Sequence, residues 1–151
     1  MQANIRSEIA RAWHWNTFIA KEAKRVNLKG KGGANMDILE KQIGGVSVIC
    51  LCGRLDAYAS NEVEKKLDSL INAARVRLVV SFDKLEYISS SGLRVLLAML
   101  KKVRKQQGDI KLAGMRTYIK EVFDIAGFAP LFNIFENENT AASSFGTGEV
   151  K

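Results

Sequence analysis

Residues 78–93 read Leu-Val-Val-Ser-Phe-Asp-Lys-Leu-Glu-Tyr-Ile-Ser-Ser-Ser-Gly-Leu. The run Leu78-Val79-Val80 is short, apolar and continuous, which is typical of a central strand covered on both faces. A loop over residues 83–91 follows, and apolar side chains at helical spacing begin at Leu93. The stretch therefore predicts the middle strand of a sheet, followed by a loop that leads three serines and a glycine into a helix.

An alternation of strands and helices extends in both directions from this stretch. Strands are predicted over residues 37–42, 46–53, 78–80, 110–113 and 131–135, and helices over residues 61–75, 91–107, 116–126 and 138–145. Gly44-Gly45 suits a tight hairpin between the first two strands, Ser60 can cap the first helix, and Gly127 can end the third. This order predicts an α/β fold, a mixed sheet of about five strands with helices packed on it.

The helical spacing also predicts which side chains enter the core. The second helix has an apolar stripe of Leu93, Leu96, Leu97, Leu100 and Val103, and the third helix has one of Ile119, Val122, Phe123 and Ala126. We expect Leu96 and Leu97 to meet Leu78 and Val80 in the core.

The positive charge is unevenly distributed along the chain. The net charge is +7 at pH 7, and residues 1–35 contribute most of it, with seven Lys/Arg against two Asp/Glu. One predicted helix is also locally basic, through Arg94, Lys101, Lys102, Arg104 and Lys105. We interpret these side chains as a solvated face and expect no direct nucleic-acid partner. The apolar runs are far shorter than the ~20 residues that cross a bilayer, so no membrane span is expected.

Cys50 and Cys52 are the only cysteines. Their spacing in a predicted strand puts both side chains on the same face, where a disulfide between them would be strained. Two thiols without a neighbouring histidine make a poor zinc site, because zinc normally takes four nitrogen or sulfur ligands. We therefore expect buried, reduced thiols, no metal or other cofactor, and a cytoplasmic protein.

Residues 1–35 differ in character from the rest of the chain. They contain both tryptophans and the only histidine, and they lack the apolar centre of a signal peptide. One interpretation is a helix on a membrane surface that uses Trp13, Trp15, Phe18 and Ile19. The favoured interpretation is a flexible or non-native extension, because two glycines shortly before an internal methionine are what a translated ribosome-binding site looks like.

This interpretation sets the expected domain boundaries. Residues 1–35 form an extension that folding does not need, residues 36–145 form one domain, and residues 146–151 form a frayed tail. Deletion of residues 1–35 should therefore leave a cooperatively folded protein.

The segment Ser89-Ser90-Ser91-Gly92 carries the clearest indication of a functional site. Packing does not require three small hydroxyl residues at a helix start, and the first N–H groups of a helix are open to an anion. A phosphate on a serine here would lie at the positive end of the helix dipole and accept several N–H bonds. The alternative is that Ser89 or Ser90 is only an N-cap.

Signatures of catalysis are absent from the sequence. A nucleophilic serine needs a base, but His14 is the sole histidine and lies in the extension, and no G-x-S-x-G elbow occurs. A P-loop, a dinucleotide fingerprint and a cluster of metal ligands are also missing. We therefore expect a binding protein and not an enzyme.

Residues 36–145 resemble the STAS family of bacterial anti-sigma-factor antagonists. Three segments carry the resemblance: Leu51-Cys52-Gly53-Arg54-Leu55-Asp56 looks like the family's strand-end G-x-L-D, Leu85 to Leu93 looks like its switch loop, and Ile119 to Phe128 looks like its helix ending in G-[FL]. The resemblance implies a STAS-like fold.

The resemblance also implies a switch by phosphorylation. Ser90 matches the serine that a partner kinase, itself the anti-sigma factor, phosphorylates, and a serine phosphatase would reset it. The implied partner-binding surface comprises Asp56, Ser89, Ser90, Ser91, Gly92 and Arg94. In its unphosphorylated form such a protein binds the anti-sigma factor and releases a sigma factor, and the phosphate opposes this binding.

Two positions depart from the family pattern. Ser89 stands where the family often has aspartate, and Arg54 stands where it often has glutamate, so two negative charges near the site are missing. The departure at Ser89 leaves room for a STAS scaffold or accessory subunit of a signalling or lipid-transport assembly that is never phosphorylated. A membrane-peripheral regulator anchored through residues 1–35 is a further alternative.

Overall fold

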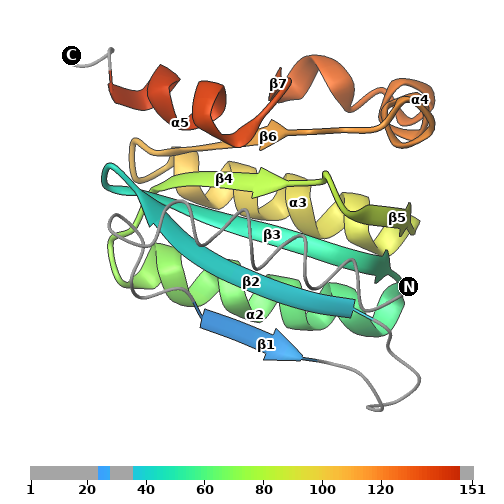
Figure 1. The fold of residues 1–151 in the computed structure, drawn as a ribbon, viewed down its shortest axis with the longest axis horizontal. Coiled ribbons are helices and arrows are strands. Elements are labelled where there is room, and N and C mark those ends of the chain that lie inside the picture. Colours follow the sequence, from blue (N-terminus) through green and yellow to red (C-terminus); the bar gives the residue numbers. More distant parts are fainter. Residues whose placement is uncertain (1–23, 28–35, 147–151) are drawn as a thin grey trace.

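The structure, a computed structural model, describes residues 24–27 and 36–146. The strands are β1 (Lys24–Asn27), β2 (Met36–Ile43), β3 (Val46–Leu55), β4 (Arg77–Ser81), β5 (Leu85–Ile88), β6 (Asp109–Ala113) and β7 (Asn133–Phe135). The helices are α2 (Ala57–Asn72), α3 (Ser90–Arg104), α4 (Thr117–Ala126) and α5 (Glu138–Gly146), with a short 3-10 helix at Ala129–Leu131. Figure 1 shows this alternation of strands and helices, which agrees with the predicted order of elements except for β1 and β5, two strands that were not predicted.

The strands form one mixed sheet, as the sequence predicts. Their order is β1-β2-β3-β4-β6-β7, and β5 pairs with β3 beyond the end of β4. β2 runs antiparallel to β1 and β3, whereas the other pairs are parallel. Gly44 and Gly45 make the predicted hairpin turn with φ of +55° and +85°. Leu78-Val79-Val80 is completely buried in β4, between β3 and β6, so the predicted central strand is confirmed.

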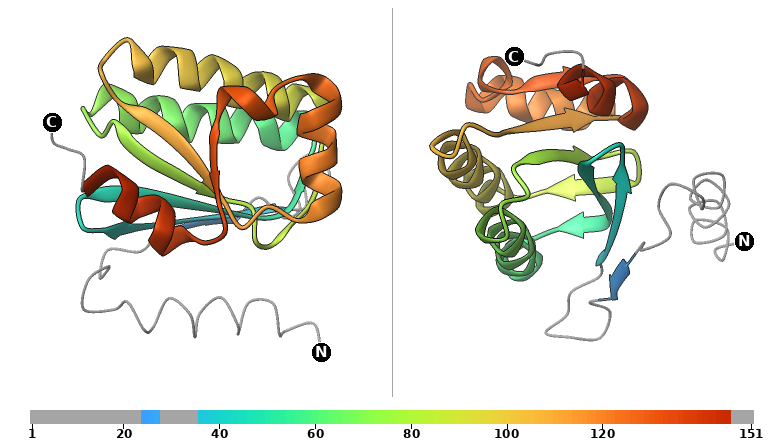
Figure 2. Two further views of the ribbon diagram at one scale, coloured as in Figure 1. Left: turned by 90° about the horizontal axis from the view of Figure 1, so that it is seen from above. Right: turned by 90° about the vertical axis from the view of Figure 1, so that its left-hand side faces the viewer.

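The two faces of the sheet are covered differently. Figure 2 shows α2 and α3 side by side over one face, where they enclose the main core. α5 packs on the opposite face, where Ala141 and Ala142 contact Val46, Val48 and Val79. Within residues 24–27 and 36–146 no helix is long and apolar enough to cross a membrane.

The first helix begins earlier than predicted. α2 starts at Ala57, and its N-cap is Asp56, whose Oδ1 accepts a hydrogen bond from the Ala59 N–H at 2.9 Å. Ser60 is not the cap, because it lies one turn inside the helix, is buried, and donates its hydroxyl to the Asp56 carbonyl.

Three further details differ from the sequence prediction. β5 lies inside the predicted loop over residues 83–91. On α3 Met99, which was not predicted to be in the core, is buried. Leu97, which was predicted to be in the core, is half-buried and packs at its margin. On α4 Ile119 and Phe123 are buried and Gly127 ends the helix with φ of +78°, but Ala126 is exposed because it lies on the solvent side of the last turn.

Part of the predicted extension belongs to the sheet. Lys24–Asn27 form β1, which pairs with β2 from Lys24 opposite Glu40 to Asn27 opposite Asp37. The predictions for residues 1–23, 28–35 and 147–151 lie outside the described residues.

Candidate functional site

The ends of two parallel strands bring the starts of α2 and α3 together. β3 and β5 pair with Leu55 opposite Ile88, so the residues that follow, Asp56 and Ser89, leave the sheet beside each other. The Ser89 N–H donates to the Leu55 carbonyl at 2.9 Å, which ties the start of α3 to the end of β3. The segments that begin at Asp56 and Ser89, which are distant in the sequence, are therefore adjacent in the structure.

The start of α3 separates the roles of the three serines. Ser89 is the N-cap, and its Oγ accepts a hydrogen bond from the Gly92 N–H at 3.1 Å. Ser90 is the first helical residue and is exposed, while Ser91 is half-buried. Ser90 is thus an exposed serine that does not make the cap, at a helix start that has no acidic residue in its first turn.

Gly92 allows α3 to approach β3 closely. A Cβ at this position would lie 2.9 Å from Leu55 Cδ2 and 3.1 Å from Ile88 Cγ1, both of which belong to completely or nearly completely buried side chains. The glycine in the motif thus has a packing role, which brings the serines against the end of β3. Gly92 therefore positions the serines and supplies no reactive group to the site.

Charged side chains surround this start unevenly. Asp56 is half-buried, and its carboxylate is held by the α2 backbone. Arg94 is exposed one turn after Ser90, on the same side of α3. Arg54, which the sequence analysis noted only as a departure from a pattern, lies with its guanidinium 4.2 Å from the centre of the Tyr87 ring. This cation–π contact joins β3 to β5 at the edge of the site, and no local sequence signal predicted it.

The two cysteines lie on β3 away from these helix starts. Both are buried and free, and their Sγ atoms are 3.5 Å apart, which agrees with the prediction of reduced thiols on one face. The hydrogen bond with Cys52 raises the pKa of the Cys50 thiol well above its ordinary value, and burial raises it further. Among residues 24–27 and 36–146 no group of three or more potential metal ligands occurs.

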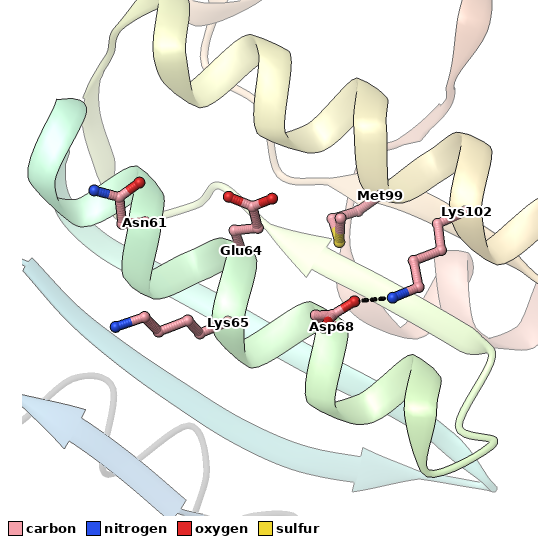
Figure 3. A pocket seen from close by; sticks show the side chains of 6 residues that line it. All are labelled: Asn61, Glu64, Lys65, Asp68, Met99 and Lys102. Atoms are coloured by element: carbon pink, nitrogen blue, oxygen red, sulfur yellow. Dashed lines mark hydrogen bonds and ion pairs between the residues drawn. The ribbon is translucent and has the colours of Figure 1, made fainter.

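A groove of about 500 Å³ lies between α2 and α3. Figure 3 shows its lining residues, Asn61, Glu64, Lys65, Asp68, Met99 and Lys102. Asp68 and Lys102 form an ion pair across it. The groove begins at Asn61 on α2 but reaches α3 only at Met99, so it does not adjoin the start of α3, and its mixed charges favour no particular ligand.

Comparison with known proteins gives a consistent result. The model of the STAS domain family matches residues 37–141. A candidate anti-sigma factor antagonist of Bordetella bronchiseptica, BtrV, is 32% identical over 112 residues, which cover 74% of this chain and 97% of that protein. The anti-sigma F factor antagonist of Paenibacillus polymyxa is 27% identical and is covered to 92%, with 71% of this chain covered. The Bacillus cell fate determinant SpoIIAA in its phosphorylated form has a similar fold, with a TM-score of 0.59, 21% identity, and coverage of 71% of this chain and 97% of that one.

Proposed function

The chain belongs to the STAS domain family, and from this premise we propose that it acts as an anti-sigma-factor antagonist. Its partner would be an anti-sigma factor, which it contacts through the joined starts of α2 and α3. In this proposal residues 36–145 are the STAS domain, residues 1–35 are an extension that adds the edge strand β1 to its sheet, and residues 146–151 are a tail. A protein with such a partner works where sigma factors work, in the cytoplasm.

The position of Ser90 is the observation that carries the proposed switch. Its hydroxyl is exposed at the first position of α3, and Ser89 makes the cap in its place. A phosphate on Ser90 would lie at the positive end of the α3 dipole. Arg94 stands one turn further on, where a guanidinium can pair with a phosphate.

The switch itself is a change of charge on the contact surface. A kinase, the anti-sigma factor itself, transfers the terminal phosphoryl group of ATP to Ser90 Oγ, and ADP and the hydroxyl proton leave. The product carries about −1.5 to −2 charges at neutral pH, which opposes burial of Ser90 against the same partner. A phosphatase hydrolyses the phosphoserine and restores binding. The catalytic work belongs to these partner enzymes, and this chain is their substrate.

The test uses the three adjacent serines as controls for one another. Incubation with ATP and the cognate anti-sigma kinase should add one phosphate, which tandem mass spectrometry places on Ser90. Ser90→Ala should abolish incorporation and retain the partner, whereas Ser91→Ala should still be phosphorylated. Ser90→Asp should weaken partner binding by about 1–3 kcal/mol, because a fixed charge is buried without a partner. Phosphate on Ser89 or Ser91 would contradict the assignment of Ser90.

A second candidate function rests on Ser89. Where related sites often have an aspartate, this chain caps α3 with a neutral hydroxyl, which suits a site that no kinase modifies. The chain would then be a scaffold or accessory subunit of a signalling or lipid-transport assembly. This candidate replaces the first if no kinase modifies any of the three serines and Ser90→Asp binds every partner normally.

A further inference from the structure

One end of the molecule carries the whole excess of positive charge of the described residues. Residues 24–27 and 36–146 contain 17 Lys/Arg and 13 Asp/Glu, a net charge of +4. Residues 68–77 and 101–109, where α2 and α3 end, hold six of these cations and two of the acids, which is also +4. The other described residues contain eleven of each and are neutral in sum. We call these two segments the basic end; its cations are Arg75, Arg77, Lys101, Lys102, Arg104 and Lys105, and its acids are Asp68 and Asp109.

Backbone contacts hold the two segments of the basic end together. The Asp109 N–H donates to the Val76 carbonyl at 2.9 Å, and Arg77 lies opposite Asp109 in the pairing of β4 with β6. A Cβ at Gly108 would lie 2.2 Å from the Val76 carbonyl oxygen, so this approach requires glycine. Figure 1 shows the segments at the end of the sheet where β2 turns into β3, away from β5. Because α3 has 15 residues and is about 22 Å long, the basic end is remote from Ser90.

Contacts within the fold neutralise only a part of this charge. Lys102 pairs with Asp68, and Arg104 pairs with Asp109 at 3.1 Å. Four cations are exposed and make no ion pair or side-chain hydrogen bond with the described residues: Arg75, Arg77, Lys101 and Lys105. The ends of α2 and α3 add about half a negative charge each through their dipoles, which is less than the excess. Stabilisation of the helix ends therefore does not account for all of these cations.

The residues around the cations indicate which anionic partner fits. The exposed residues between them are small or polar: Asn72, Ala73, Ala74, Gln106 and Gln107. A protein interface has an apolar centre, which these two segments lack. The helices also direct their carbonyl ends here, and not the N–H ends that bind nucleic-acid phosphates. Attraction to anionic lipid headgroups requires only long cationic side chains on a polar surface.

We propose that the basic end binds the anionic headgroups of a membrane surface through electrostatic attraction. Bound in this way, the chain directs the starts of α2 and α3 away from the lipid, where they stay open to a protein partner. The attraction falls off within about 10 Å at physiological salt, so the rest of the described residues take little part. It depends on fixed cations and not on phosphorylation of Ser90.

Sedimentation of the full chain with vesicles tests this binding. Vesicles of phosphatidylglycerol and phosphatidylcholine in equal parts should sediment the chain, whereas vesicles of phosphatidylcholine alone should not. Added sodium chloride should release the chain, because salt screens the attraction. Replacing Arg75, Arg77 and Lys105 with glutamine should weaken binding by about 100-fold, since each cation near an anionic surface contributes about fivefold. The proposal fails if the native chain stays in the supernatant with both kinds of vesicle.

A matched variant separates the position of the charge from its amount. Replacing Lys65, Arg116 and Lys120 with glutamine removes the same charge from exposed positions outside the basic end. This variant should bind within about twofold of the native chain, because screening limits the reach of each charge to about 10 Å. Circular dichroism and thermal unfolding establish that both variants are folded. Equal weakening by the two sets of substitutions would overturn the proposal, because net charge and not the basic end would then determine binding.

The orientation of the bound chain gives a second test. Gln106→Cys places an exposed thiol in the basic end, and Glu86→Cys places one on β5 at the other end of the molecule. The native thiols of Cys50 and Cys52 are buried, so an environment-sensitive dye should label the new thiol in each variant first. Anionic vesicles should change the emission of the dye at Gln106→Cys and not at Glu86→Cys. The reverse result would contradict the proposed orientation.

Nucleic acid is the other polyanion that the same cations can attract, and competition distinguishes it from lipid. If a short DNA duplex at equal phosphate concentration displaces the native chain from the vesicles, and the variant of Arg75, Arg77 and Lys105 loses the duplex as well, the basic end binds nucleic acid and the proposal is wrong. If the chain stays on the vesicles in the presence of the duplex, the result supports a membrane surface.

Discussion

The starts of α2 and α3 follow two strands that pair in parallel, yet they differ in the residue that caps the helix and in the third helical residue. α2 is capped by the carboxylate of Asp56 and has Ala59 at its third position. α3 is capped by the hydroxyl of Ser89 and has Gly92 at the equivalent position. One helix therefore has a permanent negative charge at its positive end, and the other has only neutral groups there.

The difference concerns the charge at the two helix starts. The carboxylate cap of Asp56 already places a negative charge at the start of α2, whereas the hydroxyl cap of Ser89 leaves the start of α3 without one, where the proposed phosphate on Ser90 would supply it. The missing methyl group of Gly92 lets this start lie directly against Leu55. Four sets of substitutions can break or sharpen this comparison.

Leu55→Ala should have the largest effect, because Leu55 serves both starts. Its side chain is completely buried, contacts the site of Gly92, and directly precedes Asp56. We expect the free energy of unfolding to fall by about 2–5 kcal/mol, measured by urea denaturation. Leu131→Ala, at an exposed leucine, should cost less than about 0.5 kcal/mol. Equal losses would mean that Leu55 does not join the two starts.

Exchanging the third residues of the helices should cost less, and for opposite reasons. Gly92→Ala overpacks the contact with Leu55, which outweighs the gain in helix propensity and leaves a loss of about 1–2 kcal/mol. Ala59→Gly should lose a similar amount through propensity and a buried methyl group. In a Leu55→Ala background the loss from Gly92→Ala should disappear, whereas the loss from Ala59→Gly should remain. A persistent Gly92→Ala loss in that background would contradict the steric explanation.

Removal of each capping side chain should show which of the two caps contributes more to the free energy of unfolding. Asp56→Ala and Ser89→Ala should each lower the free energy of unfolding by about 0.5–2 kcal/mol, with Asp56→Ala costing more because it also removes a charge from the dipole. Urea denaturation of both variants measures the difference. If Ser89→Ala costs more, the hydroxyl has a structural role beyond the cap, and the contrast between the helices is wrong.

Asp56→Asn should have the smallest effect and isolate the charge. Asparagine keeps an oxygen that can accept from the Ala59 N–H but has no net charge, so the expected loss is about 0.3–1 kcal/mol. The loss should shrink in 1 M salt, because salt screens the interaction with the dipole. A loss that is independent of salt would show that hydrogen-bond geometry and not charge distinguishes the two caps.

Local signals in the sequence predicted most elements of the fold. Gly44-Gly45, Leu78-Val79-Val80 and Gly127 are determined by backbone conformation or by complete burial, and all three predictions are confirmed. β5 was not predicted, because its four residues do not alternate regularly between buried and exposed side chains. Its pairing partner is β3, a strand distant in the sequence. The prediction that Ser60 caps the first helix is wrong, because serine is a common cap residue but tertiary packing buries Ser60 inside α2 and places Asp56 at the helix start.

The sequence predicted which segment contains the candidate site, but not how the residues of the site are arranged in space. The resemblance to a family selected Ser90, and residue types alone selected the group of serines. The sequence offered Ser89 or Ser90 as the cap, and the structure shows that it is Ser89; the sequence did not reveal that Gly92 fits against Leu55 or that Arg54 lies over Tyr87. The contacts of Gly92 with Leu55 and of Arg54 with Tyr87 join residues from different elements, so no periodicity along the chain encodes them.

β3 pairs with β2, β4 and β5, and the sequence distance to each partner determines when the site can form during folding. The β2–β3 hairpin is local and can close within about 1–10 μs, whereas the parallel pairs wait for distant segments. A nascent chain emerges from the ribosome in order, so β3 is exposed before β5 and α3 have been made. The two helix starts can therefore come together only after β5 and the start of α3 have been synthesised.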